Sequence, residues 1–202
     1  MSASRTKRLP ARERRRSILD AALTVLAQNG YAGMTTARLA RKAGVTEPIL
    51  YRHFPSKRTM LRSLLDEVTG RMMGAFHQLT GGETDPVAGL RRVCLGYPAL
   101  ARRYEREFRI INQALLEAKD ARSRELLTTH YDGYRRFLQQ LIEQGQRQGS
   151  LRDDIPAAAG AWHMIHCALG FLMTQEIRGK ATSPTLVEEF ANATLGGLLK
   201  VP

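Results

Sequence analysis

The side chains best suited to chemistry in this chain lie in residues 47–52, where helical spacing presents groups that can read DNA. At 100° per residue, Pro48 and Arg52 point directly away from Leu50 and Phe54, which lie four residues apart on an apolar face. An exposed arginine can pair bidentately with guanine, and an apolar group can touch the methyl of thymine. The flanks of this outward face are Ile49 and Tyr51.

Two short helices joined by a tight turn are predicted to carry this face, over residues 35–54. The hydroxyl of Thr35 can cap the first helix, and Gly44 supplies the positive φ that ends it. Thr46 can cap the second helix in the same way. A helix-turn-helix places its second helix in the major groove. An ordinary pair of packed helices is the alternative, but the caps, the turn glycine and the exposed Arg52 together favour DNA binding.

Positive charge is concentrated around the same segment. Residues 1–60 hold thirteen Lys and Arg against three acidic residues, and therefore ten of the chain's twelve net positive charges. A basic excess confined to the helix-turn-helix segment is the electrostatic pattern expected for phosphate binding. A merely soluble basic protein would spread its charge more evenly.

The stretch from about Arg12 to Val68 resembles the DNA-binding domain of the TetR family of transcriptional regulators. An opening amphipathic helix, RRRSILDAALTVLAQNGYAGMTT, is followed by LARKAGV and then by the LYRHFPSK block. The rest of the chain is similar to the family only in length and helical content. The resemblance implies an all-helical homodimer, without a cofactor, whose two recognition helices read a palindromic operator in double-stranded DNA.

The resemblance also implies roles for individual residues. Base readout falls to Thr46, Glu47, Pro48, Ile49 and Arg52, and phosphate contacts fall to Thr36, Tyr51, His53 and Lys57. Each of the four residues expected to contact phosphate can donate a hydrogen bond. Lys57 follows a predicted N-cap at Ser56, so the positive end of the next helix would point at the DNA backbone. His53 could instead be a structural hydrogen-bond former, and Lys57 a solvated charge. Glu47 and Ile49 lack an obvious base partner, and Ala37 departs from the polar residue often found in relatives.

The predicted fold class is all-α, with an N-terminal three-helix helix-turn-helix domain and a larger helical domain for ligand binding and dimerisation. We expect a flexible basic arm over 1–10, the DNA-binding domain over 11–56 and the second domain over 57–202. Apolar periodicity predicts no sheet. The helices expected after the motif cover 56–79, 86–103 with an interruption at Gly96-Tyr97-Pro98, 105–119, 122–148, 157–178 and 184–199.

Residues 157–178 are apolar nearly all round, so this helix must be buried on more than one side. Burial within one subunit is one explanation. The resemblance assigns the last two long helices to a two-fold dimer interface, where one side packs within the subunit and the other across the axis.

Family resemblance further implies an apolar cavity for an unknown small-molecule effector in the second domain. Candidate lining residues mix aromatic, aliphatic and amide side chains, although ordinary core residues have the same composition. They are Phe76, Tyr97, Phe108, Ile111, Asn112, Leu115, Tyr134, Trp162 and His166.

Other classes of site find little support in the sequence. His163, His166 and Cys167 have a spacing that could place metal ligands on one helix face, but no second cluster completes a metal site. No Gly-x-Ser-x-Gly elbow, phosphate loop or HExxH motif is present, so we expect no catalytic residues and no enzyme. The two cysteines suit reduced packing residues. Without an apolar signal or membrane segment, a cytoplasmic protein is expected.

The sequence therefore predicts a dimeric transcriptional regulator, a repressor that an effector releases from a palindromic operator. The alternatives are an effector-independent activator or architectural DNA-binding protein, and a small-molecule-binding helical protein without operator-specific binding.

Overall fold

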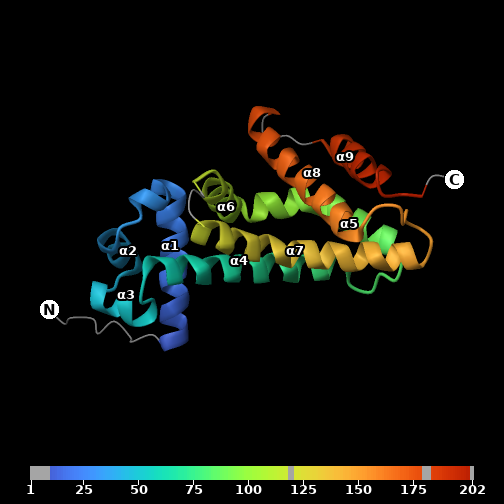
Figure 1. Cartoon of the computed structure of the whole chain (residues 1–202). Coiled ribbons are helices and arrows are strands. Elements are labelled where there is room, and N and C mark those ends of the chain that lie inside the picture. Colours follow the sequence, from blue (N-terminus) through green and yellow to red (C-terminus); the bar gives the residue numbers. More distant parts are fainter. Residues whose placement is uncertain (1–9, 118–120, 179–182, 201–202) are drawn as a thin grey trace. The chain divides into compact units, whose positions relative to one another are not determined.

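The computed structural model describes residues 10–117, 121–178 and 183–200, and these residues form nine α-helices and no strand (Figure 1). An isolated antiparallel bridge joins Leu151 to Leu199 within the described chain. The all-α prediction is confirmed. No helix among the described residues is long and apolar enough to cross a membrane.

Contacts divide the chain into two compact units. The first unit comprises the described residues of Met1–Glu67 and Arg106–Arg124, and the second those of Val68–Glu105 and Glu125–Pro202. Helix α4, Lys57–Thr80, contributes residues to both units. The expected boundary at residue 56, the end of the DNA-binding domain, remains a prediction.

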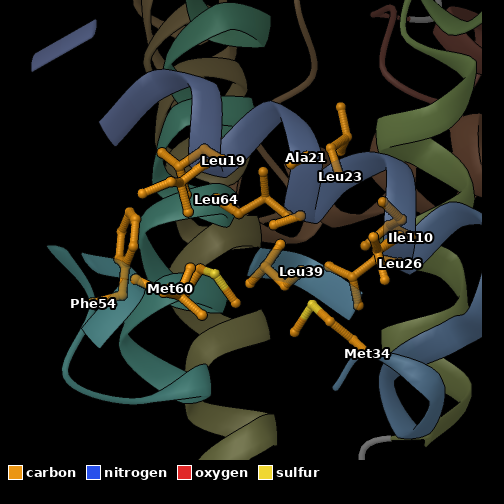
Figure 2. Close-up of a cluster of buried hydrophobic side chains, with 14 residues drawn as sticks. Leu19, Ala21, Leu23, Leu26, Met34, Leu39, Phe54, Met60, Leu64 and Ile110 are labelled. Carbon is orange, nitrogen blue, oxygen red and sulfur yellow. The ribbon is translucent and has the colours of Figure 1, made fainter. Parts of the chain in front are cut away.

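The first unit contains α1 (Ala11–Gly33), α2 (Thr36–Ala43), α3 (Glu47–His53), the start of α4 and most of α6 (Glu105–Glu117). Figure 2 shows its core, with Leu39 of α2 between side chains of α1 and α4. Ile110 of α6 joins this cluster. Burying such aliphatic side chains stabilises the fold by about 1.5–3 kcal/mol each before entropy is counted. The cluster therefore fixes the two short helices, which could not be stable alone.

Helix α1 changes direction before the motif begins. Gly30 has φ 65° and ψ 179°, a conformation that breaks helical geometry and that glycine adopts without steric cost. Arg38 of α2 then donates from Nη1 to the carbonyl oxygen of Gly33 at 3.1 Å. This turn delivers the chain to the N-cap of α2.

The second unit is a helical assembly built from the remainder of α4, α5 (Pro86–Arg103), most of α7 (Ala121–Arg147), α8 (Ala157–Arg178) and α9 (Pro184–Gly196). Ring contacts join α4 to α7, since Phe76 stacks on Phe137 with centroids 5.8 Å apart. Helix α5 packs against α8 and α9. Arg91 of α5 also donates to Oδ1 of Asn192 at 2.6 Å and pairs with Glu188, both on α9.

Two helix predictions need correction. Helix α5 runs without a break through Gly96-Tyr97-Pro98, so the expected interruption is wrong. Pro98 is fully buried, and packing around it offsets the missing backbone donor that usually breaks a helix. The last helix ends at Gly196 rather than at residue 199, because Leu198 and Leu199 bond back to the Leu195 carbonyl and Leu199 enters the bridge with Leu151.

Candidate nucleic-acid interface

The turn between α2 and α3 has the backbone geometry that the sequence predicts. The side chain of Thr35 accepts a hydrogen bond from the backbone N–H of Arg38 at 3.3 Å, which caps α2. Gly44 lies in the left-handed region at φ 63° and ψ 36°, and its N–H bonds back to the carbonyl oxygens of Ala40 and Arg41. Both predictions are confirmed. The helix is thereby ended within one residue, as a close helix pair requires.

The side-chain cap predicted at Thr46 is absent from the structure, although Thr46 is the N-cap residue. Thr46 occupies the N-cap position of α3 with φ −86° and ψ 157°, but its side chain makes no capping hydrogen bond. Pro48 in the first turn lacks an N–H and so removes one of the donors that a cap would satisfy. The Thr46 side chain is exposed.

Helix α3 separates a buried face from an exposed one. Leu50 and Phe54 are each 3% exposed and anchor the helix in the core of the first unit. Of the five residues predicted to read bases, Thr46, Glu47, Pro48 and Arg52 are exposed and Ile49 is half-buried. Glu47 lies in the first turn, where its carboxylate complements the positive N-terminal end of the helix dipole. Arg52 lies in the last turn, where its guanidinium complements the negative C-terminal end.

Three of the four residues predicted to contact phosphate are brought together. Thr36, Tyr51 and Lys57 line one surface pocket between α2, α3 and the start of α4. Tyr51 is 47% exposed, so a large part of this residue is open to solvent. His53 is half-buried and does not line this pocket. The pocket's floor is apolar, with Met34, Leu39, Leu50, Phe54 and Met60 beneath the polar rim.

The start of α4 is capped as predicted at Ser56. Its Oγ accepts from the N–H of Thr59 at 3.1 Å, and its own N–H donates to Oγ1 of Thr59 at 3.0 Å. This reciprocal pair is a capping box with threonine in place of the usual glutamate. Lys57 follows directly, and partial burial lowers its pKa from the ordinary lysine value. An anion beside this ammonium would favour its charged form and oppose that shift.

Sequence reasoning missed two arginines that shape this region. Arg38 closes the end of α1 through the Gly33 carbonyl, and Arg15 contacts both Ser63 and Phe54. Arg15 lies in a run of basic residues, where one side chain that makes tertiary contacts has no local signal to distinguish it from its neighbours.

The residues predicted to line an effector cavity are divided between the two units. Phe76, Tyr97, Tyr134, Trp162 and His166 belong to the second unit, whereas Phe108, Ile111 and Asn112 belong to the first. The side chain of Leu115 lies outside the described residues. Within the second unit the rings of Phe76 and Tyr134 meet edge to face at 5.9 Å, and those of Trp162 and His166 stack at 5.6 Å.

A polar cluster that the sequence did not indicate lies beside Tyr134. His130 is 3% exposed and its Nδ1 lies 2.6 Å from the hydroxyl of Thr69. The imidazole also meets the rings of Tyr131 and Tyr134 edge to face. Desolvation raises the pKa of Tyr131 to about 12 and, with Tyr131 nearby, raises that of Tyr134 as well. Both phenols are therefore neutral hydrogen-bonding groups at ordinary pH.

His163 and Cys167 on α8, whose spacing could suit metal ligands, make other contacts. Nε2 of His163 lies 3.1 Å from the Thr194 carbonyl oxygen, and the Cys167 sulfur lies 3.8 Å from the same nitrogen. Among the described residues, no group of three or more His, Cys, Asp or Glu is arranged to hold a metal ion. Cys94 is buried and Cys167 half-buried, and both are free thiols.

Comparison with known proteins agrees with this geometry. Residues 18–64 match the sequence model for bacterial regulatory proteins of the tetR family. The nucleoid occlusion factor SlmA of Vibrio cholerae is 32% identical over 138 residues, which cover 67% of this chain and 70% of that protein. The chain belongs to the TetR family of DNA-binding regulators.

Solved structures show the same fold over nearly the whole chain. The regulator FadR of Bacillus subtilis, in complex with stearoyl-CoA, superposes with a TM-score of 0.80 at 20% identity, over 90% of this chain and 98% of that one. A transcriptional regulator of Saccharomonospora viridis, in complex with choline, has a TM-score of 0.75 at 22% identity, over 94% and 100%. At these identities the likeness concerns the fold.

Proposed function

We propose that this protein is a homodimeric transcriptional repressor of the cytoplasm, which a small-molecule effector releases from a palindromic operator. One observation carries the DNA-binding part. The exposed face of α3 lies beside a pocket that Thr36, Tyr51 and Lys57 line, in the segment that holds most of the positive charge. In this arrangement Thr46, Glu47, Pro48, Ile49 and Arg52 face base edges. His53 contributes a phosphate contact only if the helix end approaches the backbone closely.

The dimer is proposed through α8 and α9. Trp162 is 36% exposed and Met173 is 59% exposed in the isolated chain, and both lie on α8. Gly170, also exposed, permits close approach of a second helix. A two-fold axis here would bury this apolar face and present two recognition helices to two half-sites, one turn of DNA or a multiple of it apart.

The effector is proposed to bind in the second unit beside Tyr134. The Tyr134 hydroxyl is buried, and no well-formed hydrogen bond to it is present among the described residues. Thr69 is close enough to oppose the rise in the pKa of this phenol, but its hydroxyl is engaged by His130. A buried donor that lacks a hydrogen-bond acceptor lowers the stability of the fold by about 1–3 kcal/mol. A ligand oxygen that accepts from the Tyr134 hydroxyl would remove this penalty. The stearoyl-CoA and choline complexes of the related folds support binding of a small molecule by this fold.

A second candidate is a DNA-binding protein that acts without an effector. The similarity to a protein named nucleoid occlusion factor favours it, because that name refers to the nucleoid. In this case the second unit would serve dimerisation and contacts with other proteins.

A gel shift with the DNA upstream of the protein's own gene, at two salt concentrations, tests the proposal. Operator binding predicts tight, palindrome-dependent association that weakens with salt. Binding that ignores sequence at both salt concentrations would contradict a regulator. Thermal shift with choline and with stearoyl-CoA, on the parent and on Tyr134→Phe, then separates the two candidates: a shift that the variant loses supports an effector site.

A further inference from the structure

Arg15 makes two tertiary contacts at once in the first unit. Its Nη2 donates to the hydroxyl of Ser63 on α4 at 2.7 Å. The carbon at the centre of its guanidinium lies 4.8 Å from the centroid of the Phe54 ring. The side chain therefore stacks on one residue while its edge bonds to another.

These contacts join three segments that must hold a fixed relation for DNA to be read. Arg15 itself lies on α1, and Ser63 on α4. Phe54 is the C-cap of α3, and its N–H bonds to the Leu50 carbonyl. A planar guanidinium can stack on a ring and donate from its edge, whereas an ammonium cannot do both with the same geometry. One side chain thus ties the end of the recognition helix to the two helices behind it.

We infer that Arg15 is a positioning residue for DNA reading, which holds α3 at its binding angle rather than contacting phosphate. This inference rests on the proposed operator binding. When only a fraction of the molecules hold α3 correctly, the apparent dissociation constant rises by the inverse of that fraction. Loss of the Arg15 contacts lowers that fraction and weakens binding without removing a charge from the DNA interface.

The neighbouring Arg16 provides a matched control. It is exposed and lies on the same helix, and its side chain makes no hydrogen bond, ion pair or ring contact among the described residues. Arg15→Lys and Arg16→Lys both keep the charge. On the duplex that the parent binds in the gel shift, Arg15→Lys should weaken binding about threefold to tenfold, while Arg16→Lys should leave it unchanged. The slope of affinity against salt should be the same in all three proteins, because the count of phosphate contacts is unchanged.

Ser63→Ala supplies a milder second variant in case Arg15→Lys folds poorly, which far-UV circular dichroism will show. It removes the hydrogen bond but leaves the ring contact, so a loss of about twofold to threefold is expected. Combined with Arg15→Lys it should add little, because the effect of Ser63 on binding acts through Arg15.

Arg15→Gln completes the set and distinguishes positioning from phosphate contact. Positioning predicts that Arg15→Lys is nearly as impaired as Arg15→Gln. If Arg15→Lys binds as the parent does, or if it restores both the affinity and about one unit of salt slope that Arg15→Gln loses, the inference is overturned. A parent protein that shows no sequence preference would overturn the proposed function itself, and that result is read before any variant is compared.

Discussion

The two compact units differ in what determines their structure. In the first unit, short-range features fix α2 and α3: a threonine cap, a left-handed glycine and a proline in the first turn. In the second unit, long helices meet through residues far apart in sequence, such as Phe76 with Phe137 and Arg91 with Asn192. Charge follows the same division, because most of the net positive charge lies in residues 1–60. A DNA-reading surface can therefore be recognised locally, whereas a ligand site depends on packing.

The largest expected loss of stability follows a substitution in the core of the first unit. Leu39 is 1% exposed, and Leu39→Ala should lower the free energy of unfolding by about 2–5 kcal/mol, through lost burial and the cavity left behind. Leu61→Ala, a partly buried member of the same cluster, should cost only about 1 kcal/mol. Urea denaturation of both variants measures the difference. Equal losses would mean that the cluster does not organise this unit around Leu39.

Alkaline pH should act on the second unit through its buried thiol and phenols. Burial raises the pKa of Cys94 from 9.0 to about 12, and that of Tyr131 from 10.0 to about 12. A group whose pKa is higher in the folded state stabilises the fold below its unfolded pKa and loses that contribution as pH rises through the folded value. The free energy of unfolding should thus fall between about pH 9 and pH 12, by about 1.4 kcal/mol per pH unit for each such group.

The variant Tyr131→Phe isolates one of these groups. Its unfolding free energy should fall less steeply than the parent's between about pH 10 and pH 12, because no phenol remains to ionise at that position. Urea denaturation at a series of pH values gives both curves. Parallel curves would show that Tyr131 is not protected from ionisation by burial.

The smallest expected change in stability comes from a pair of glycine substitutions, one in each unit. Gly44 has φ 63° and Gly70 is an exposed residue within α4, and a Cβ at either position would meet no atom within 4 Å. Gly44→Ala should destabilise by about 1 kcal/mol through backbone strain. Gly70→Ala should stabilise by about 1 kcal/mol through helix propensity. Changes of the same sign in thermal denaturation would refute the assignment of Gly44 as a backbone requirement.

The sequence predicted the helix-turn-helix well because its determinants lie within a few residues of one another. Thr35, Gly44 and Ser56 act on their own neighbours, so their roles could be inferred before any packing was known. Thr46 occupies the N-cap position as predicted, but its side chain makes no capping hydrogen bond, and the sequence does not determine that orientation. Arg15 could not be anticipated, because its partners lie 39 and 48 positions away and nothing local marks it among four nearby arginines.

Beyond the motif, periodicity gave the helices but not their partners. The bounds 157–178 match α8, since an apolar run between a proline and a glycine is a local signal. The break predicted at Pro98 was wrong because burial of the ring depends on other helices. Assigning Phe108 and Tyr134 to one cavity required long-range packing, and the structure places them in different units.

The base preference of two variants tests the central claim, that the outward face of α3 reads sequence while its neighbours hold the backbone. Binding of the parent, Arg52→Ala and Lys57→Ala is measured on an operator duplex and on every single-base-pair change of it, at two salt concentrations. Arg52→Ala should lose discrimination at one base pair in each half-site, whereas Lys57→Ala should weaken every duplex alike and reduce the salt slope by about one. If both variants keep the parent's base preferences and its salt slope, the assignment of this face is wrong.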